Sequence, residues 1–315
     1  MKKLQRSHVL STYYAPRGHE RMYALGMQLA QLYLSPYDKL IGIIGDSGSG
    51  KSALIRGMFP GLELTNDDDG VYVRPLPLLD QGMSFFKPHT YHVDIRFENG
   101  FTQMSELADG IWQALHDGKR VVVEHFELVY PLLGINAHLL IGVGEKVLIA
   151  RPNIFGPHPE EISSVVFPSL RNRLMCHTAE DLCEICLPVA EQDRLSHSDV
   201  TNGFVLNFPG EKPQFDILEL EKKVHDLIAQ DLPITYVDHN HVSIGGMLHR
   251  CTGPRIHVSS TGQIEGFRLL HHFIPDNLHH INILVGCVGE GSEQRLAELE
   301  KTAVASGMTR ETGFF

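Results

Sequence analysis

A glycine-rich segment near residue 45 carries the strongest chemical signal in the chain. It reads G-D-S-G-S-G-K-S, which matches the phosphate-binding pattern G-x-x-x-x-G-K-[ST]. The apolar run Leu40–Ile44 precedes it, so a buried strand, a glycine-rich turn and a helix starting at Lys51 are expected in succession. In such a turn the backbone N–H groups and the lysine bind phosphates, and the serine hydroxyl ligates Mg²⁺. We therefore predict that ATP and Mg²⁺ are bound by Gly45, Asp46, Ser47, Gly48, Ser49, Gly50, Lys51 and Ser52.

A phosphate site of this kind also needs a carboxylate at the end of a neighbouring strand, where it holds a metal-bound water or orients the attacking one. Glu124 ends the β-branched run 120–124 and is the first candidate, with Glu127 near it. Asp94, in the strand-like stretch 91–96, is the second. The alternative is that Glu124 is only the first exposed residue after a buried strand. We predict that Lys51, Glu124 and Asp94 are catalytic and that Glu124 holds Mg²⁺ through water.

Regular elements that would position these side chains follow one another along the first half of the chain. Helical spacing of apolar residues predicts helices over 20–34 and 104–116. Continuous apolar or β-branched runs predict strands over 70–74, 91–96, 120–124, 137–143 and 146–150. Strands that alternate with helices and are apolar throughout indicate an α/β fold with a mainly parallel sheet covered by helices on both faces.

Three regions are expected along the chain. Residues 1–155 form the nucleotide-binding domain, and the proline-rich and glycine-rich stretch 151–168 leads out of it. Residues 156–232 form a mostly helical connector, with helices over 169–187 and 211–231. Residues 233–315 form a smaller α+β domain, in which Gly245 and Gly246 make a hairpin turn and 292–305 form the last helix.

Length and charge exclude several classes of protein. A chain of 315 residues with 43% apolar content can build two real cores. Its formal charge of −11 argues against a protein that coats nucleic acid by bulk attraction. No apolar stretch has the length of a membrane span, and the basic start has no signal core behind it. Five cysteines are an odd number, unlike a disulfide scaffold. We expect a cytoplasmic protein with reduced thiols.

The glycine-rich segment and its neighbours resemble the TsaE family, the small ATPases of tRNA threonylcarbamoyladenosine synthesis. The resemblance covers roughly residues 1–154 and lies in L-G-x-x-L-A at 25–30, G-D-x-G-x-G-K at 45–51, and R-G at 56–57. His92-Val93-Asp94 and Val123-Glu124 follow in the family's order. The resemblance implies a MgATP-hydrolysing ATPase linked to tRNA, with tRNA or a tRNA-modifying protein as partner.

Departures from that family keep a kinase alternative open. The expected tyrosine before Arg96 is missing, His125 stands where tryptophan is usual, and the acidic triplet Asp67, Asp68, Asp69 occupies the place of a different segment. An acidic segment there resembles uridine-kinase-like phosphotransferases, in which an aspartate accepts the proton of the substrate. The triplet is either such a base, a metal ligand or a solvated loop. In the kinase alternative the C-terminal domain is the substrate pocket.

The last domain resembles the second additional domain of alanyl- and threonyl-tRNA synthetases, over about forty residues. The likeness lies in R-C-T-G-P-R-I-H-V-S-S-T-G-Q-I, residues 250–264. In that family a cysteine and a histidine of this segment, together with an H-x-x-x-H pair, bind the metal of the editing site. The resemblance implies that Cys251 and His257 ligate Zn²⁺, and it adds aminoacyl-tRNA editing as a further alternative function.

The remaining zinc ligands are left open by the sequence, because no two histidines are four residues apart. The candidate pairs are His239 with His241 and His249 with Cys251, each of which shares one strand face. A two-residue turn at 245–246 pairs Val242 with His249, which places the two pairs on opposite faces unless a bulge intervenes. The alternative to a zinc site is a hairpin with ordinary surface histidines.

Two further groups of residues are judged structural or are left without a chemical interpretation. Cys176, Cys183 and Cys186 surround His177, but Thr178 and Asp181 are typical of a helix start, so we expect the cysteines to be buried core residues of a helix. The pairs at 271–272 and 279–280 are histidines that flank a loop, and no chemistry is assigned to them.

Overall fold

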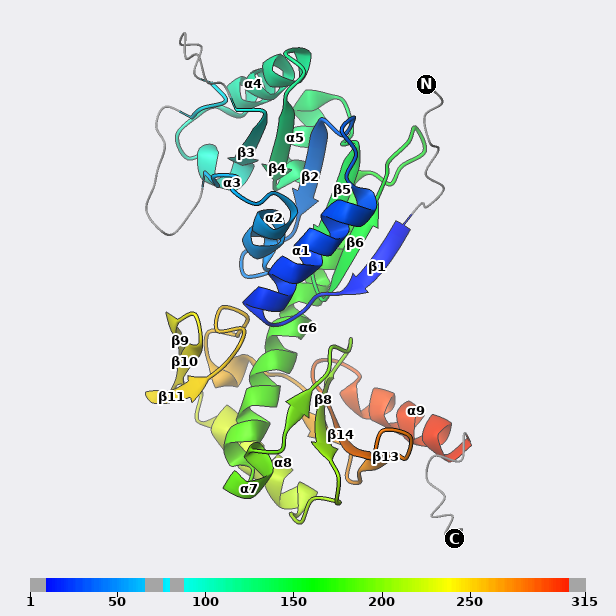
Figure 1. Cartoon of the computed structure of the whole chain (residues 1–315). Helices are drawn as coiled ribbons and strands as arrows, with labels where there is room; N and C mark the ends of the chain where they lie inside the picture. Colours follow the sequence, from blue (N-terminus) through cyan, green and yellow to red (C-terminus); the bar gives the residue numbers. More distant parts are fainter. Residues whose placement is uncertain (1–9, 66–75, 80–87, 306–315) are drawn as a thin grey trace. The chain divides into compact units, whose positions relative to one another are not determined.

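The computed structural model describes residues 10–65, 76–79 and 88–305. The chain divides into two compact units, Met1–Leu170 and Arg171–Phe315. This division falls inside one continuous helix, α6 (Pro159–Cys186), and the three expected regions with boundaries at 155 and 232 stay a prediction. The predicted strand 70–74 and the acidic triplet 67–69 lie outside the described residues. Figure 1 shows the elements of both units.

The first unit is built on a six-stranded sheet with the order β1-β6-β5-β2-β4-β3. Strands β2, β3, β4 and β5 pair in parallel, while β6 and β1 are added antiparallel at one edge. The predicted α/β class with a mainly parallel sheet is confirmed. The strands are β1 (Leu10–Tyr14), β2 (Leu40–Ile44), β3 (Thr90–Asp94), β4 (Arg120–Glu124), β5 (Leu139–Val143) and β6 (Lys146–Ala150).

Helices cover both faces of this sheet, and a separate apolar core fills each side. On one face α1 and α2 pack over Ile41, Ile43 and Ile141. On the other face α4, α5 and the start of α6 pack over Val93, Val121 and Val123. The strands are therefore buried on both faces, which is why they read as continuous apolar runs. The helices are α1 (His19–Tyr33), α2 (Lys51–Met58), α3 (Ile95–Glu98), α4 (Met104–His116) and α5 (Phe126–Leu133).

Parallel pairing brings the carboxyl ends of β2, β3 and β4 to one edge of the sheet. Glu124 at the end of β4 is in register with Ile43 of β2 and with Asp94 of β3. Strand β3 ends at Asp94, two residues before the predicted end, because the Asp94 Oδ1 atom accepts a hydrogen bond from the Phe97 N–H group and caps α3.

Helices α1 and α2 touch through two glycines. A Cβ atom at Gly26 would lie 2.3 Å from the carbonyl oxygen of Leu54, and one at Gly57 would lie 2.1 Å from the carbonyl oxygen of Tyr23. Both distances are too short for any side chain. The L-G and R-G pairs noted in the sequence therefore mark the place where two helix backbones meet.

Gly26→Ala is expected to destabilise the protein by about 1–3 kcal/mol, because the new methyl group must push the two helices apart. Alanine favours a helix over glycine by about 1 kcal/mol, so a net loss reports the steric contact alone. Chemical denaturation measures the change, and Gln28→Ala on the exposed face of α1 is the control. A Gly26→Ala protein as stable as the unchanged protein would contradict this contact.

The second unit packs its core against the C-terminal half of α6. Met175, Ala179 and Leu182 of this helix share one apolar core with buried residues of β8 and α8, and Cys176 and Cys183 are fully buried in the same core. The expected burial is confirmed for Cys176 and Cys183, whereas Cys186 is only half-buried. The helix runs uninterrupted through 178–181, so the predicted helix start at Thr178 and Asp181 is wrong. Its elements besides α6 are α7 (Val189–Gln192), β7 (Ser196–His197), β8 (Phe204–Pro209), α8 (Ile217–Ala229), β12 (Arg268–Leu269), β13 (Ile274–Asp276), β14 (Ile281–Cys287) and α9 (Ser292–Ala305).

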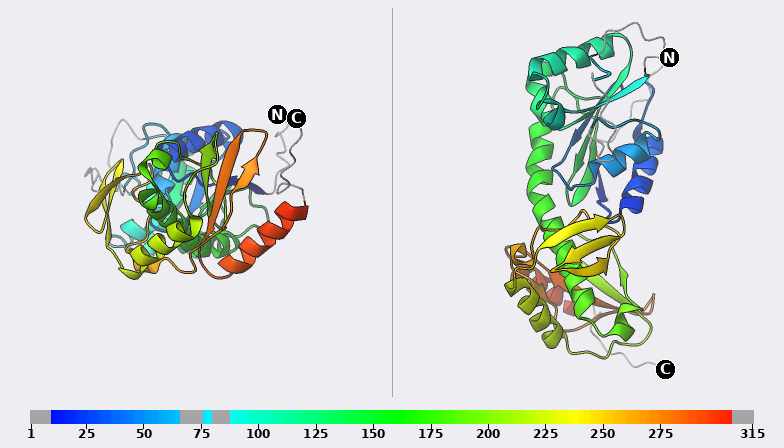
Figure 2. Two further views of the ribbon diagram at one scale, coloured as in Figure 1. Left: turned by 90° about the horizontal axis from the view of Figure 1, so that it is seen from below. Right: turned by 90° about the vertical axis from the view of Figure 1, so that its left-hand side faces the viewer.

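A separate three-stranded sheet, β9 (Ile234–Asp238), β10 (His241–Ile244) and β11 (Met247–Arg250), completes the second unit. It is drawn as yellow arrows in the right-hand view of Figure 2. The predicted two-residue turn at Gly245 and Gly246 is present, and Val242 pairs with His249 as expected. Both glycines have positive φ angles, 58° and 87°, as a turn of this kind requires. Within the described ranges, no helix has both the length and the apolar character needed to cross a bilayer.

Candidate functional site

The glycine-rich loop, residues 45–52, lies between the end of β2 and the start of α2. Gly48 and Gly50 have φ angles of 79° and 89°, which only glycine adopts readily. A Cβ atom at Gly45 would lie 2.6 Å from the carbonyl oxygen of Val143, so the loop passes directly over the end of β5. The loop ends in the N-terminus of a helix, where unpaired backbone N–H groups and the helix dipole favour an anion. Ser52, the proposed Mg²⁺ ligand, is half-buried in the first turn of α2.

Lys51 and Glu124 lie together beneath this loop. The Lys51 Nζ atom donates a hydrogen bond to the backbone oxygen of Asp46, at 3.0 Å, and lies 3.6 Å from the Glu124 Oε2 atom. Both side chains are buried, so the pair lies in a region of low dielectric where charges interact strongly. The structure therefore brings together two of the three residues that the sequence predicted to be catalytic.

A histidine that the sequence interpretation did not assign a role holds the other oxygen of Glu124. The Thr65 N–H group donates to the His92 Nδ1 atom at 3.1 Å, so the proton of the neutral ring lies on Nε2. That Nε2–H group donates to Glu124 Oε1 at 3.0 Å. Burial raises the pKa of Glu124, but the hydrogen bond from His92 and the nearby positive charge of Lys51 outweigh it and leave the pKa below its ordinary value. Glu124 is therefore held as a carboxylate.

Asp94 and Glu127 take other positions around Glu124. Asp94 is in register beside Glu124 but its Oδ1 atom caps α3, so part of its hydrogen-bonding capacity is structural. Glu127 contacts the His125 Nδ1 atom at 3.3 Å, and its buried Oε2 atom has no hydrogen-bond partner within the described part of the chain. His125, directly after Glu124, has a φ angle of 54°, a strained value that clusters at functional sites.

Arg96 reaches the outer side of the loop. Its Nη1 atom lies 2.6 Å from the Asp46 Oδ1 atom, and both side chains are about half exposed. Burial raises the pKa of Asp46, but the hydrogen bonds from Arg96 and the Ser47 N–H group outweigh it and lower the pKa. The contact fixes the first turn of the loop against α3.

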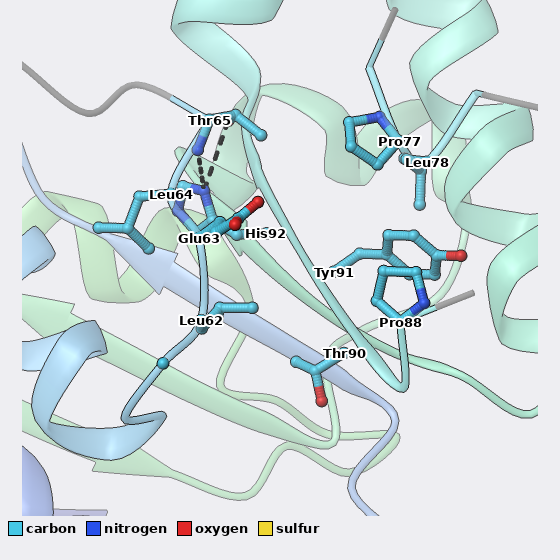
Figure 3. A pocket seen from close by; sticks show the side chains of 11 residues that line it. Leu62, Glu63, Leu64, Thr65, Pro77, Leu78, Pro88, Thr90, Tyr91 and His92 are labelled. Atoms are coloured by element: carbon cyan, nitrogen blue, oxygen red, sulfur yellow. Dashed lines mark hydrogen bonds between the residues drawn. The ribbon is translucent and has the colours of Figure 1, made fainter. Parts of the chain in front are cut away.

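A cavity of about 290 Å³ lies beside β3 (Figure 3). Leu62, Leu64 and Thr65 form one side, and Pro77, Leu78 and Pro88 face them (Figure 3). His92 contributes to the wall, so the cavity adjoins the residue that holds Glu124. The acidic triplet that the kinase alternative requires, Asp67 to Asp69, lies outside the described residues, and that alternative stays a prediction.

A second group of candidate residues lies in the second unit. His177, Asp181, Cys251 and His257 each offer one ligand atom, and these four atoms lie within 4.8 Å of one another. The Cys251 Sγ atom is 3.1 Å from His177 Nε2 and 3.4 Å from His257 Nε2. The structure thus brings Cys251 and His257 together as the zinc interpretation requires. Two nitrogens, a thiolate sulfur and a carboxylate are a donor set typical of zinc.

Hydrogen bonds leave the metal-facing nitrogens of this group available. The Thr178 hydroxyl donates to the Leu174 carbonyl oxygen, so it accepts from the His257 Nδ1–H group and leaves the Nε2 lone pair facing Cys251. His177 donates from Nδ1 to the Glu180 carboxylate, which orients its Nε2 atom toward the same sulfur. Such outer partners are usual for metal-bound histidines.

Electrostatics set the protonation states of the histidine and the thiol in this group. Burial and the neighbouring His177 and His249 lower the pKa of His257 well below its ordinary value. Burial and the Asp181 carboxylate raise the pKa of the Cys251 thiol, so without a metal the thiol is protonated. A dication at this position would reverse that preference and displace the proton.

Sequence reasoning missed His177 and Asp181, which supply the helical half of this group. His177 and Asp181 are four residues apart, which places them on one face of a helix. This spacing of a histidine and a carboxylate is the one local signal of the group in the sequence. The candidate pair His239 and His241 does not join the group, and the His241 Nδ1 atom lies 2.9 Å from Asp238 instead.

The histidine pairs at 271–272 and 279–280 belong to neither group. His271 lies 2.8 Å from Glu221, and His279 lies 2.8 Å from Asp276. Each of these two rings therefore pairs with a local carboxylate.

Comparisons with known proteins do not place this chain in a family. No family model matches it, and no curated protein matches it. Among solved structures, an amino transferase from Eubacterium rectale is 11% identical with a TM-score of 0.23, over 96% of this chain and 75% of that chain. This likeness is too weak to bear on the fold or the function.

Proposed function

We propose that the first unit binds and hydrolyses ATP with Mg²⁺. The observation that carries this proposal is the convergence of the glycine-rich loop, Lys51 and Glu124 at one sheet edge, with the Lys51 Nζ atom 3.6 Å from the Glu124 carboxylate. A buried lysine beneath a loop of positive-φ glycines at a helix N-terminus is the arrangement that phosphoryl transfer requires.

Each residue takes a defined part in this proposal. Backbone N–H groups of the loop bind the phosphate oxygens, and Lys51 exchanges its Asp46 and Glu124 contacts for a phosphate. The Ser52 hydroxyl ligates Mg²⁺, which neutralises charge on the phosphates. Glu124 accepts a hydrogen bond from the attacking water or from a Mg²⁺-bound one, and His92 holds that carboxylate in place. Asp94 supports the same edge through its cap on α3.

We propose that this ATP hydrolysis serves a step of tRNA or aminoacyl-tRNA metabolism. Both resemblances support this assignment, that of the first unit to tRNA-modification ATPases and that of the second to a synthetase editing domain. The proposed partners are accordingly tRNA or a tRNA-modifying protein.

A measurement of ATP consumption by the full chain tests this proposal. It is made in parallel without additions and with nucleosides, amino acids or tRNA fractions. Hydrolysis to ADP and phosphate without an acceptor, altered by tRNA, is expected. A phosphorylated nucleoside as product would establish the kinase alternative instead. A protein that neither binds nor consumes ATP under any of these conditions would refute the proposed function of the first unit.

His92→Ala is expected to lower the hydrolysis rate about tenfold at neutral pH while ATP affinity changes little, because Glu124 loses the donor that orients it. The pKa of Glu124 rises when this hydrogen bond is lost, so the acid limb of the pH profile moves to higher pH. The rate measured across pH checks both effects. His116→Ala, an exposed histidine at the end of α4, is the control. An unchanged pH profile in His92→Ala would contradict the positioning role.

A second candidate function, metal binding in the second unit, is favoured by the group of His177, Asp181, Cys251 and His257. Zinc held by these residues supplies either a structural cross-link or, where a coordination position stays open, an activated water for hydrolysis. Asp181 and His177 come from α6, and Cys251 and His257 come from the segment after β11. The editing alternative rests on this centre.

A further inference from the structure

The metal group is part of a longer arrangement of potential ligands. On α6, His177, Asp181 and Glu184 are four and three residues apart, so they form one stripe along the helix. On the facing segment, His249 and Cys251 are two residues apart and share one side of the extended chain. The stripe and the segment run along each other, with His177 beside Cys251 at one end and Glu184 beside His249 at the other.

Asp181 lies in the middle of this arrangement and faces both ends. Its Oδ2 atom is 3.5 Å from the His257 Nε2 atom and 3.7 Å from the His249 Nε2 atom. Among the residues that the structure describes, neither Asp181 Oδ2 nor His249 Nε2 has a hydrogen-bond partner, although both atoms are buried. An unpaired buried carboxylate oxygen costs free energy, and a cation is the partner that would satisfy it together with the facing histidine nitrogen.

We propose that the second unit holds two divalent cations, with Asp181 shared between them. The first cation is the one bound by His177, Cys251, His257 and Asp181, and the inference rests on that proposed centre. The second is bound by Asp181, Glu184 and His249, whose ligand atoms also lie within 4.8 Å of one another. Carboxylate-bridged pairs of metal ions about 3.5–4 Å apart are a common hydrolytic arrangement.

The two sites differ in the number of protein ligands and in exposure. The first has four protein ligands, which is the closed set of a structural zinc site. The second has three, which leaves a position open for water or for the oxygen of a carbonyl or phosphate ester. The side chains of Glu184 and His249 are 28% and 13% exposed, against 3–6% for His177, His257 and Asp181. The second cation is therefore the exchangeable one that a substrate can reach.

One further side chain, His197, contacts a ligand of the second site. The His197 ring lies 3.2 Å from Glu180 and 3.4 Å from Glu184. A cation bound at Glu184 displaces the His197 Nε2 atom from that carboxylate, whereas the His197 Nδ1 atom keeps its contact with Glu180.

Titration of the metal-stripped full chain with Co²⁺ tests the proposal. A thiolate ligand to Co²⁺ gives a charge-transfer band in the near ultraviolet, whereas nitrogen and oxygen ligands give only weaker visible bands. The first equivalent is expected to produce both kinds of band through Cys251. A second equivalent is expected to add visible absorbance without further charge transfer, and to be lost first on dialysis against a chelator.

Glu184→Gln is the decisive variant. This variant is expected to bind one equivalent of Co²⁺ and to show the full charge-transfer band. Its metal content, measured by elemental analysis, should be half that of the unchanged protein. His249→Ala should behave in the same way and serves where Glu184→Gln does not fold. Glu219→Gln, which removes a surface-exposed carboxylate paired with Lys223 on α8, is the matched control and should still bind two equivalents.

The outcomes separate the two proposals. In one outcome, the charge-transfer band and all visible absorbance both saturate at one equivalent of Co²⁺. That result would overturn the two-cation proposal and would leave the single centre at Cys251 supported. Two equivalents retained in both Glu184→Gln and His249→Ala would overturn the assignment of ligands. The absence of any charge-transfer band would refute the centre at Cys251, and with it the two-cation proposal.

Discussion

Replacing Lys51 by alanine is expected to remove measurable ATP binding and to reduce ATP hydrolysis by about 100-fold or more. Lys51 is the buried positive charge beneath the glycine-rich loop, and a fixed charge aimed at developing negative charge is the largest single contribution in reactions of this kind. The variant also leaves the buried Glu124 carboxylate without its neighbouring cation, so its pKa rises and it becomes a poorer acceptor.

Titration with a fluorescent ATP analogue and a phosphate-release assay measure the two effects of Lys51→Ala. Lys146→Ala is the matched control, because Lys146 is an exposed lysine at the start of β6 in the same sheet. The thermal transitions of both variants establish that they fold. Wild-type ATP affinity in a folded Lys51→Ala protein would refute the nucleotide site.

Zinc is expected to raise the melting temperature of the protein, and Cys251→Ser is expected to abolish this increase. A ligand that binds only the folded state at a hundred times its Kd adds about 2.7 kcal/mol of stability. For a domain of this size that corresponds to roughly 5–10 °C. A serine oxygen binds zinc much more weakly than a thiolate does. Replacing the one sulfur atom of Cys251 by oxygen is therefore expected to remove the zinc-dependent rise in melting temperature.

Calorimetry with zinc and then with excess chelator measures the shift, and elemental analysis gives the metal content. Cys186→Ser is the matched control, since Cys186 lies on the same helix α6 but contributes no ligand atom to the metal group. Two results would contradict the proposed zinc centre. One is a folded wild-type protein that takes up no zinc, and the other is a Cys251→Ser protein that still shows the full zinc-dependent rise in melting temperature.

The first unit could be predicted from the sequence because its signals are local. The strand at 40–44, the glycines that follow and Lys51 are adjacent in the chain, so each confirms the interpretation of the next. Glu124 was predicted correctly to end a strand, and parallel pairing alone is enough to bring it to the edge where Lys51 lies. Nucleotide binding and hydrolysis stay predictions until ATP is measured.

The second unit could be predicted only in part because its candidate site is assembled from distant segments. His177 and Cys251 are 74 residues apart, and nothing local at either position indicates the other. The helix around Asp181 was also misjudged, since threonine followed three residues later by aspartate is typical of a cap, but tertiary packing extends the helix through that point. The hairpin register was predicted because a two-residue turn fixes it.

The contact of Gly26 with Gly57 makes α1 and α2 one rigid body. Two helix backbones that touch without side chains between them cannot slide or tilt independently, and α2 begins at the glycine-rich loop. A Cβ atom at Gly50 would lie only 3.2 Å from the Met22 side chain of α1, so the loop itself rests on that helix. The outer face of α1, where Met27 and Leu32 are exposed, is therefore mechanically linked to the glycine-rich loop at the end of β2. A force that tilts α1 would tilt α2 and move this loop with it.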